Sequence, residues 1–478
     1  MKKFIISLLL FSFMIFWACM PTDPDQPTDE SINAASLVLS KMVAVGNSLT
    51  AGVQSTGLLQ DFQMHSYPYL IAQQMGQAAN FQQPLVASPG LGSPLGMTPQ
   101  MYDPATGAIT QDVLPITDPA QLAGYLLNPY LPRAYDNMGI PGFDLNDALN
   151  TTSGGMADLV LRNPDFGNTT QLQQAMGLSP TLLILWLGNN DVLGAALDGG
   201  DLTQITSAAD FTSRLTQVLT YIRVDQGYAN AIVMANIPTV SDIPYVNMLD
   251  GIFVDPGTGT AIPMLFDLTF QPIDFGFGLM LPLITEETGV THVTLPGALA
   301  YQAGLGVPDS AYIVNNFGYP PGMAASIVAG LVAEGITPTG LPIPGDMTIT
   351  ATEEAAIAAA VTGFNTIIDQ LAAAFSVQAV MDANTALATL NSTGIDGFTG
   401  HYVYMNPSGT AFSLDGVHPN NAGYAIIANE FIKVINTYLG QNLPLLTTAQ
   451  YGGQYTGALP KITTAKAIEG VRELFRKN

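Results

Sequence analysis

The fold of this protein is decided by a stretch near the start of the chain, VAVGNSLTAG, which runs from Val43 to Gly52. An apolar, strand-like run leads there into a turn of small residues around Ser48, which opens a helix. In open α/β sheets, ligands bind beyond the carboxyl ends of parallel strands, so we expect the Ser48 hydroxyl to face that crevice. Its backbone N–H is also one of the donors that a helix N-terminus leaves without an intrahelical partner.

Similar apolar runs recur along the chain and alternate with longer helix-like stretches. Short buried strands that alternate with helices are typical of βαβ units and of a parallel sheet covered on both faces. The sequence therefore predicts an α/β fold. The predicted strands are Met42–Val45, Thr181–Leu187, Ala231–Ala235 and Gln378–Met381, and the predicted helices are Tyr67–Met75, Leu202–Arg223, Glu353–Phe375 and Asn421–Leu439.

Two stretches break this alternation, at about 81–131 and 246–344, and both are rich in Gly, Pro, Met, Phe and Tyr. Long segments without regular structure are uncommon in a compact domain unless they are functional. We interpret them as insertions that form a cap or a cleft wall within one domain spanning residues 36–443. Residues 444–478 then form a C-terminal tail.

The N-terminus has the pattern of an export signal. Lys2 and Lys3 precede a mostly apolar run that is too short to span a bilayer and ends at Ala18. Cys19 is the only cysteine, and the stretch FWAC before and including it resembles a loose lipobox. We therefore expect a lipoprotein signal peptide at 1–18, lipidation of Cys19, and a flexible acidic, Pro-rich tether at 19–35. The expected location is the outer membrane or cell surface of a bacterium, with attachment by lipid.

Composition excludes several classes of protein. The chain of 478 residues has 13 Lys and Arg against 37 Asp and Glu, which gives a formal net charge of −24. Such a charge repels phosphate backbones, so nucleic-acid binding is not expected. From Val224 to Ile432 there is no Lys or Arg and there are eighteen acidic residues, which disfavours anionic substrates or simply marks an acidic secreted surface.

A second polar motif lies near the other end of the chain, where SLDGVHPN covers residues 413–420. The three-residue offset allows Asp415 and His418 to meet across a turn. The carboxylate would then hold the imidazole Nδ1–H and leave Nε2 to face a nucleophile. Pro419 suits the first position of the following helix, because no amide donor is needed there.

If Ser48, His418 and Asp415 act together in acyl transfer, the site also requires hydrogen-bond donors for the developing oxyanion. The segments YDNMGIPG at 135–142 and LWLGNND at 185–191 both follow apolar runs and end in turn residues. Gly142 can offer a backbone N–H and Asn190 a side-chain amide at the same sheet edge as Ser48. The nearby glycines 139, 90 and 92 are alternatives to Gly142.

Taken in order, these four segments resemble the blocks of the SGNH (GDSL-type) hydrolases: residues 46–49, with Asn47 where Asp is commoner, then 137–142, 188–191 and 415–418. The resemblance implies a three-layer α/β/α sandwich around a parallel sheet of about five strands in flavodoxin-like order. It also implies Ser48 as nucleophile, His418 as general base and Asp415 as the residue that orients the base. The oxyanion hole would comprise the Ser48 and Gly142 amides and the Asn190 side chain.

The function expected from these residues is hydrolysis of carboxylic esters through an acyl-enzyme. The substrate is either a lipid or acyl ester or an O-acetylated carbohydrate, as a small molecule or a polysaccharide. The alternative is a non-catalytic, surface-binding lipoprotein on the same scaffold. No cofactor is expected, and no metal site, because His65, His292 and His401 are far apart in sequence.

Overall fold

The computed structural model describes residues 37–457, except 94, 117–118, 162, 164–165, 251–252, 255–260, 268–271, 277 and 404–405. The expected signal peptide, Cys19, the whole of the tether and residues 458–478 of the tail lie outside the described residues.

The centre of the molecule is a five-stranded parallel sheet in the order β14-β8-β7-β1-β6. When the five strands are numbered in chain order and read from β6, the order is 2-1-3-4-5, which is that of flavodoxin-like folds, as predicted. The strands are β1 (Met42–Gly46), β6 (Asn137–Gly139), β7 (Leu182–Trp186), β8 (Ala231–Ala235) and β14 (Ala379–Met381).

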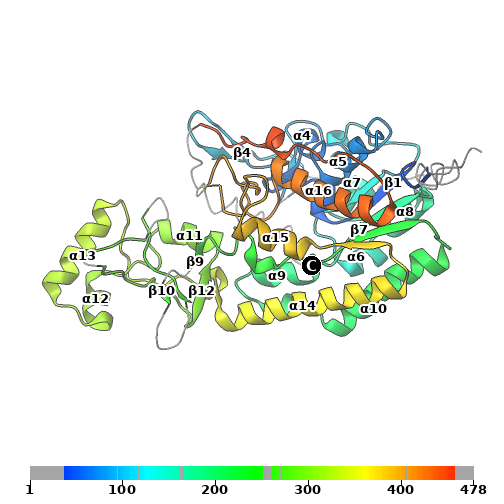
Figure 1. Ribbon diagram of the computed structural model, residues 1–478. Helices are drawn as coiled ribbons and strands as arrows, with labels where there is room; N and C mark the ends of the chain where they lie inside the picture. Colours follow the sequence, from blue (N-terminus) through cyan, green and yellow to red (C-terminus); the bar gives the residue numbers. More distant parts are fainter. Residues whose placement is uncertain are drawn as a thin grey trace, which may run out of the picture.

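Helices cover both faces of this sheet and complete the three layers (Figure 1). Met42 and Ala44 of β1 face the layer of α5 (Tyr67–Gln74) and α16 (Asn421–Leu439). Val43 and Val45 alternate to the opposite face. That face packs against α8 (Gln171–Gly177), α9 (Asn190–Leu197), α10 (Ala208–Thr220) and α14 (Ala351–Ala374).

The longest of these helices, α14, has the length and apolar composition of a membrane-spanning segment. In this fold it packs beside α10 on the sheet, where Phe211 and Phe364 stack with ring centroids 4.0 Å apart. Packing within this helical layer therefore explains part of the apolar composition of α14.

The sequence predicts one continuous helix over Leu202–Arg223, and this prediction is wrong. The segment contains a 3₁₀ turn, η3 (Leu202–Gln204), and then α10, with a π-helical turn at 221–225. The break occurs because extended Ser207 caps α10, its hydroxyl accepting from the Asp210 N–H at 3.1 Å. Among the other predicted elements, β8 and α16 have the predicted bounds.

Short elements connect the layers, and most lie before β7. They are α3 (Ser48–Ala51), β2 (Gly57–Leu58), α4 (Gln60–Gln63), α6 (Leu145–Asn150), α7 (Ala157–Val160), η5 (Val240–Asp242), α15 (Ala383–Ser392) and η7 (Thr448–Tyr451).

Both predicted insertions contain short elements of their own. Residues 81–131 hold β3 (Leu91–Gly92), the hairpin β4–β5 (Met101–Tyr102 and Ile109–Thr110) and η1 (Pro119–Tyr125), and β3 pairs with β2. Residues 246–344 form most of a lobe that projects to one side of the sandwich (Figure 1). The lobe contains β9 (Leu249–Asp250), β10 (Phe253–Val254), β11 (Ala261–Ile262), β12 (Val290–Val293), α11 (Leu295–Gln302), α12 (Ser310–Phe317) and α13 (Pro321–Ala333), and is completed by η6 (Gly345–Met347) and β13 (Thr348–Thr350).

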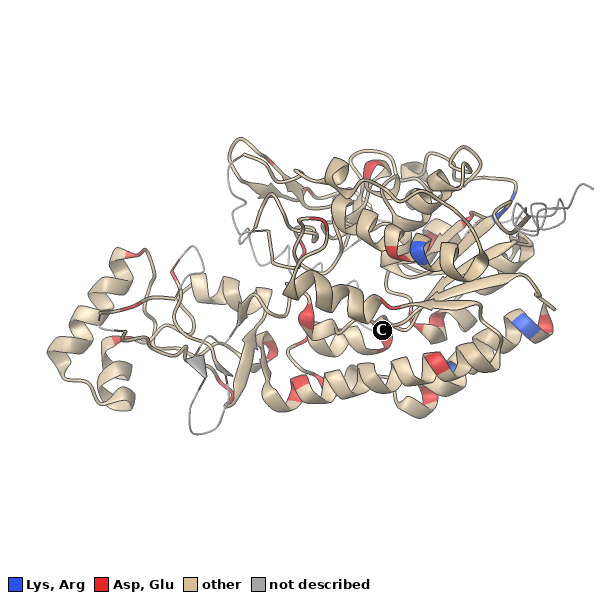
Figure 2. Ribbon diagram, viewed as in Figure 1, with Lys and Arg blue, Asp and Glu red and all other residues tan. Residues whose placement is uncertain are grey.

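The lobe belongs to the part of the chain, 224–432, that has no Lys or Arg, and in Figure 2 the charged residues marked on its mostly uncharged ribbon are acidic. The charged side chains described at this end of the molecule are therefore all acidic.

Candidate active site

Ser48 is the first residue of α3 and follows directly on the carboxyl end of β1, as the sequence predicts. Asn47 caps this short helix, its side-chain oxygen accepting from the Leu49 N–H at 3.1 Å. Gly46 leaves the space for the turn, because a Cβ there would lie 2.0 Å from Thr50 Oγ1. Ser48 is only 3% exposed, so the expected nucleophile is almost entirely buried.

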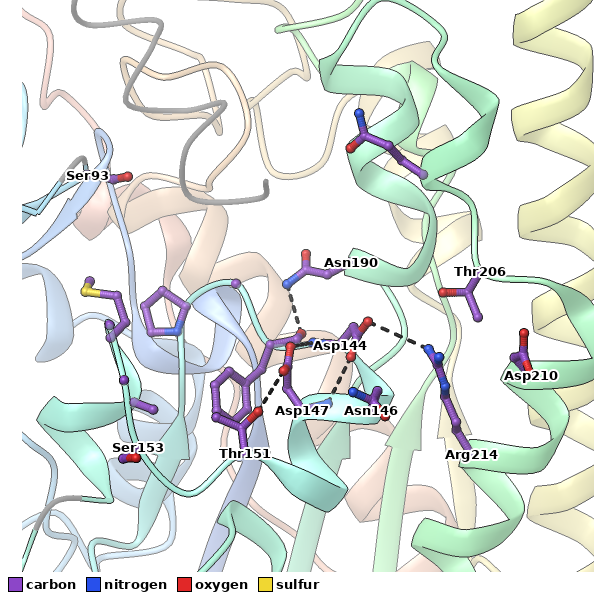
Figure 3. Close-up of a pocket in the computed structure, with 18 of the residues that line it drawn as sticks. Ser93, Asp144, Asn146, Asp147, Thr151, Ser153, Asn190, Thr206, Asp210 and Arg214 are labelled. Atoms are coloured by element: carbon purple, nitrogen blue, oxygen red, sulfur yellow. Dashed lines mark hydrogen bonds and ion pairs between the residues drawn. The ribbon is translucent and has the colours of Figure 1, made fainter. Parts of the chain in front are cut away.

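A large cleft of about 1130 Å³ lies beside the same sheet edge and is lined by two of the expected oxyanion donors, Gly142 and Asn190. Figure 3 shows Asn190 among the side chains of this cleft. The Asn190 side-chain N–H donates to the Phe143 carbonyl at 2.9 Å. An amide nitrogen carries two hydrogens, so this bond fixes the side chain and leaves the second N–H for another acceptor. Gly142 has a φ of +85°, a conformation that favours glycine.

The three alternative glycines have their backbone N–H groups engaged within the fold. Gly139 donates to Asn137 Oδ1 at 2.9 Å, Gly90 to the Ala87 carbonyl at 2.9 Å, and Gly92 to the Met97 carbonyl at 2.7 Å. A donor already used in this way is poorly placed to stabilise an oxyanion. The hydrogen bonds therefore favour Gly142 among the four candidates.

The lining of the cleft is mostly polar, and the first insertion contributes Gly92, Ser93 and Leu95 to it. Its ionisable side chains are Asp144, Asp147, Asp210 and Arg214. Sequence reasoning missed Arg214, whose guanidinium lies 3.8 Å from Asp144 and 3.7 Å from fully buried Asp191. These contacts connect Arg214 of α10 with the N-cap residue of α6 and with α9, and no local sequence motif indicates them.

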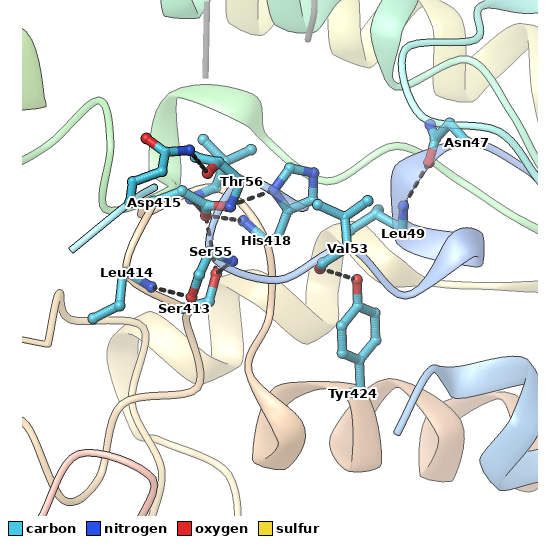
Figure 4. A network of polar contacts seen from close by, with 12 residues as sticks. Asn47, Leu49, Val53, Ser55, Thr56, Ser413, Leu414, Asp415, His418 and Tyr424 are labelled. Carbon is cyan, nitrogen blue, oxygen red and sulfur yellow. Dashed lines mark hydrogen bonds and ion pairs between the residues drawn. The ribbon is translucent and has the colours of Figure 1, made fainter. Parts of the chain in front are cut away.

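Asp415 and His418 meet as their spacing predicts, with 2.8 Å between Asp415 Oδ2 and His418 Nδ1 (Figure 4). The other carboxylate oxygen accepts from the N–H groups of Val417 and His418, both at 2.9 Å, and from the Ser413 hydroxyl at 3.0 Å. Both side chains are buried, with Asp415 0% and His418 1% exposed. The carboxylate thus fixes the ring and directs Nε2 away from itself.

The surroundings of Asp415 keep its carboxyl ionised. Burial by itself would raise the pKa of this group, but the charge of His418 and the hydrogen bonds from His418 and the Thr56 N–H outweigh burial and lower the pKa. An ionised Asp415 accepts a hydrogen bond from the Nδ1–H of His418 and can stabilise a positive charge on the ring.

Backbone contacts join the Asp415–His418 loop to the chain that leaves α3. The Ser55 N–H donates to Ser413 Oγ at 2.9 Å, and the Thr56 N–H donates to Asp415 Oδ2 at 2.7 Å. On the same stretch, Val53 accepts from the Tyr424 hydroxyl at 2.7 Å. Through these contacts, the loop that carries His418 lies against the chain segment that follows Ser48.

The prediction for Pro419 is wrong. Helix α16 begins at Asn421, so Pro419 lies two residues before its first position. The reason is that Asn420 caps the helix, its side-chain oxygen accepting from the Gly423 N–H at 3.0 Å. Pro419 instead forms a bridge with Phe412 that closes the loop around His418.

Within the described residues, no group of three or more His, Cys, Asp or Glu side chains is arranged to hold a metal ion. Comparison with known proteins finds no family model, no curated protein and no solved structure that matches this chain. Any function must therefore be argued from the site itself.

Proposed function

We propose that this protein is a serine ester hydrolase that acts through an acyl-enzyme. The observation that carries the proposal is the buried Asp415–His418 pair, at 2.8 Å, tied by the backbone of Thr56 to the segment that follows Ser48. The order of the four sequence segments, which resembles that of SGNH hydrolases, supports the same interpretation.

In this proposal, His418 accepts the Ser48 proton as the serine oxygen attacks the carbonyl carbon of an ester. The oxyanion receives hydrogen bonds from the backbone N–H groups of Ser48 and Gly142 and from the second Asn190 N–H. His418 then donates its proton to the leaving alcohol. Water, deprotonated by His418, then attacks the carbonyl carbon of the acyl-enzyme. His418 returns that proton to the Ser48 oxygen as the ester bond to Ser48 breaks and the acid leaves.

The test is covalent labelling with a fluorophosphonate probe, together with turnover of p-nitrophenyl acetate. We expect wild-type protein to be labelled at Ser48, and Ser48→Ala to lose both labelling and turnover while remaining folded. Ser66→Ala is a matched control, because Ser66 is a buried serine that hydrogen-bonds to Gln83 and has no place in the proposed site.

Labelling that persists in Ser48→Ala would refute the assignment of the nucleophile. Wild-type protein that neither reacts with the probe nor turns over any ester would instead fit a non-catalytic, surface-binding lipoprotein.

A further inference from the structure

The side chain of Gln171, the first residue of α8, bridges the ends of two neighbouring strands of the sheet. It is 0% exposed, and its amide Nε2 donates to the Gly46 carbonyl at 2.7 Å and to the Met138 carbonyl. An amide nitrogen carries two hydrogens, so these two bonds use both of them. Gly46 ends β1 and Met138 lies in β6, so one side chain spans this strand pair near its carboxyl end.

Both strands lead from these carbonyls into the proposed active site. Ser48 comes two residues after the first carbonyl, and Gly142 comes four residues after the second. The Ile140 N–H also donates to the Gly46 carbonyl, at 3.1 Å. The segment that carries Gly142 is therefore held against the end of β1 by the Gln171 side chain and by this bond, in addition to the pairing of the two strands.

The same segment is attached on its other side to the helix that carries the third proposed oxyanion donor. The Phe143 carbonyl accepts from the Asn190 side chain at 2.9 Å, and the Leu145 N–H donates to Asp191 Oδ2 at 3.2 Å. These contacts fix the segment to α9, whereas Gln171 fixes it to the strand that precedes the nucleophile. Loss of the Gln171 bonds would leave the two sides of the oxyanion hole less firmly connected.

We propose that Gln171 is a positioning residue, which sets the separation between the backbone N–H groups of Ser48 and Gly142. The inference rests on the proposed function and adds a residue to the same site. Gln171 is fully buried and does not line the cleft, so it acts through these two groups without touching the substrate. Donors stabilise an oxyanion only where they are fixed at the place where charge develops. A displacement of about 1 Å can cost about 10²-fold in rate.

The test variant is Gln171→Met, which keeps an unbranched side chain of similar size and removes both donors. We expect kcat for p-nitrophenyl acetate to fall by about 10–10²-fold while KM changes little, because the loss is confined to the transition state. Phenylboronic acid forms a tetrahedral adduct with a serine oxygen, so its inhibition constant should rise by the factor by which kcat/KM falls. Labelling with the fluorophosphonate probe counts the active sites, so that kcat refers to folded enzyme.

Gln174→Met is the matched control on the same helix. Gln174 is also buried, and the Oε1 atoms of both glutamines have no hydrogen-bond partner within the described residues. Its Nε2 donates to the Leu161 carbonyl at 3.2 Å and to Thr169 Oγ1 at 3.1 Å, and neither acceptor belongs to β1 or β6 or lines the cleft. Gln174→Met should therefore lose stability as Gln171→Met does, and should keep the wild-type kcat and inhibition constant.

A second variant, Gln171→Glu, tests the role while keeping the shape of the side chain. A protonated carboxyl has one O–H donor in place of the two N–H donors of the amide. Burial against two carbonyl oxygens favours this protonated form. The kcat of Gln171→Glu should therefore lie between those of wild type and Gln171→Met, and a wild-type kcat in this variant would count against the proposal.

Equal kcat values in Gln171→Met and Gln174→Met would overturn the positioning role, while Ser48-dependent turnover left the proposed function standing. A rise in KM without a fall in kcat would also overturn it, because such a change reports weaker ground-state binding. Turnover that does not depend on Ser48, or no turnover of any ester by wild-type protein, would refute the proposed function and the role of Gln171 with it.

Discussion

The Asp415 carboxylate accepts hydrogen bonds from five donors: the Ser413 hydroxyl, the backbone N–H groups of Thr56, Val417 and His418, and the imidazole of His418. A carboxylate satisfied in this way is held rigidly, and its charged form is favoured in spite of burial. At the scale of the residue, the site is therefore organised around an acid that joins its own loop to Thr56, in a segment far away in the sequence.

The lowered pKa of Asp415 predicts a contribution to stability that depends on pH. In the unfolded chain the pKa of Asp is about 3.9, and the folded value is lower, so the contribution is complete above about pH 4. It is lost as pH falls through the folded pKa. The difference in free energy of unfolding between wild type and Asp415→Asn should therefore narrow on acidification from pH 7 to pH 3. Urea denaturation at each pH measures it, and a constant or widening difference would contradict the prediction.

Asn190 gives a second prediction at this scale. Replacement of Asn190 by Ala should lower kcat by about 10²–10³ and change KM little, because an oxyanion donor acts in the transition state. Steady-state kinetics with p-nitrophenyl acetate measure this. Asn189→Ala is the control, because Asn189 is also buried but its side chain has no hydrogen-bond partner among the described residues. An equal loss of kcat in both variants would show that the effect is structural.

At the scale of the element, close packing of β6 against α3 positions Ser48, the proposed nucleophile. A Cβ atom on Gly139, at the end of β6, would lie 2.2 Å from the Ala51 nitrogen and 2.5 Å from the Thr50 carbonyl carbon. The backbone of the helix that carries Ser48 thus passes directly over this glycine.

Gly139→Ala should therefore destabilise the protein by about 1–3 kcal/mol or more and reduce ester turnover, since α3 must shift. Gly177→Ala is the matched control, because nothing lies within 4 Å of a Cβ at that helical position. Its stability should be unchanged or rise by about 0.4–1 kcal/mol. Thermal and urea unfolding of the pair provide the comparison, and equal stabilities would show that the close approach is unimportant.

The elements also show how far sequence reasoning reaches. Strand β8 and helix α16 were predictable to the residue because their apolar patterns are local. Strand β6 was not, because it has three residues and begins with Asn137, whose side chain is satisfied by the Thr50 carbonyl and Gln83. The Asp415–His418 contact follows from a three-residue spacing. The preference for Gly142 over the other three glycines depends on hydrogen bonds that only the structure reveals. The Arg214 contacts depend on how three helices pack together, which no local sequence pattern predicts.

At the scale of the whole molecule, the excess of negative charge affects stability. The net charge is −24, and residues 224–432 have acidic residues without any Lys or Arg (Figure 2). Like charges on one compact body repel each other and oppose folding.

Added NaCl should therefore stabilise this protein. An increase from about 0.01 M to about 0.15 M shortens the Debye length from about 30 Å to about 8 Å, which screens repulsion between distant carboxylates. Thermal unfolding at pH 7 across this range should show a melting temperature that rises with salt. A melting temperature that falls would indicate that attractive ion pairs, such as those of Arg214, outweigh the repulsion.

The contact between Thr56 and Asp415 has a consequence for how the protein is made, because its partners are 359 residues apart. At a synthesis rate of about 5–20 residues per second, roughly 20–70 s separate the translation of the donor from that of its acceptor. All five strands of the sheet are translated before Asp415. The Asp415–His418 segment on which the proposed function depends, and helix α16, which covers one face of the sheet, are therefore the last of these parts to be made.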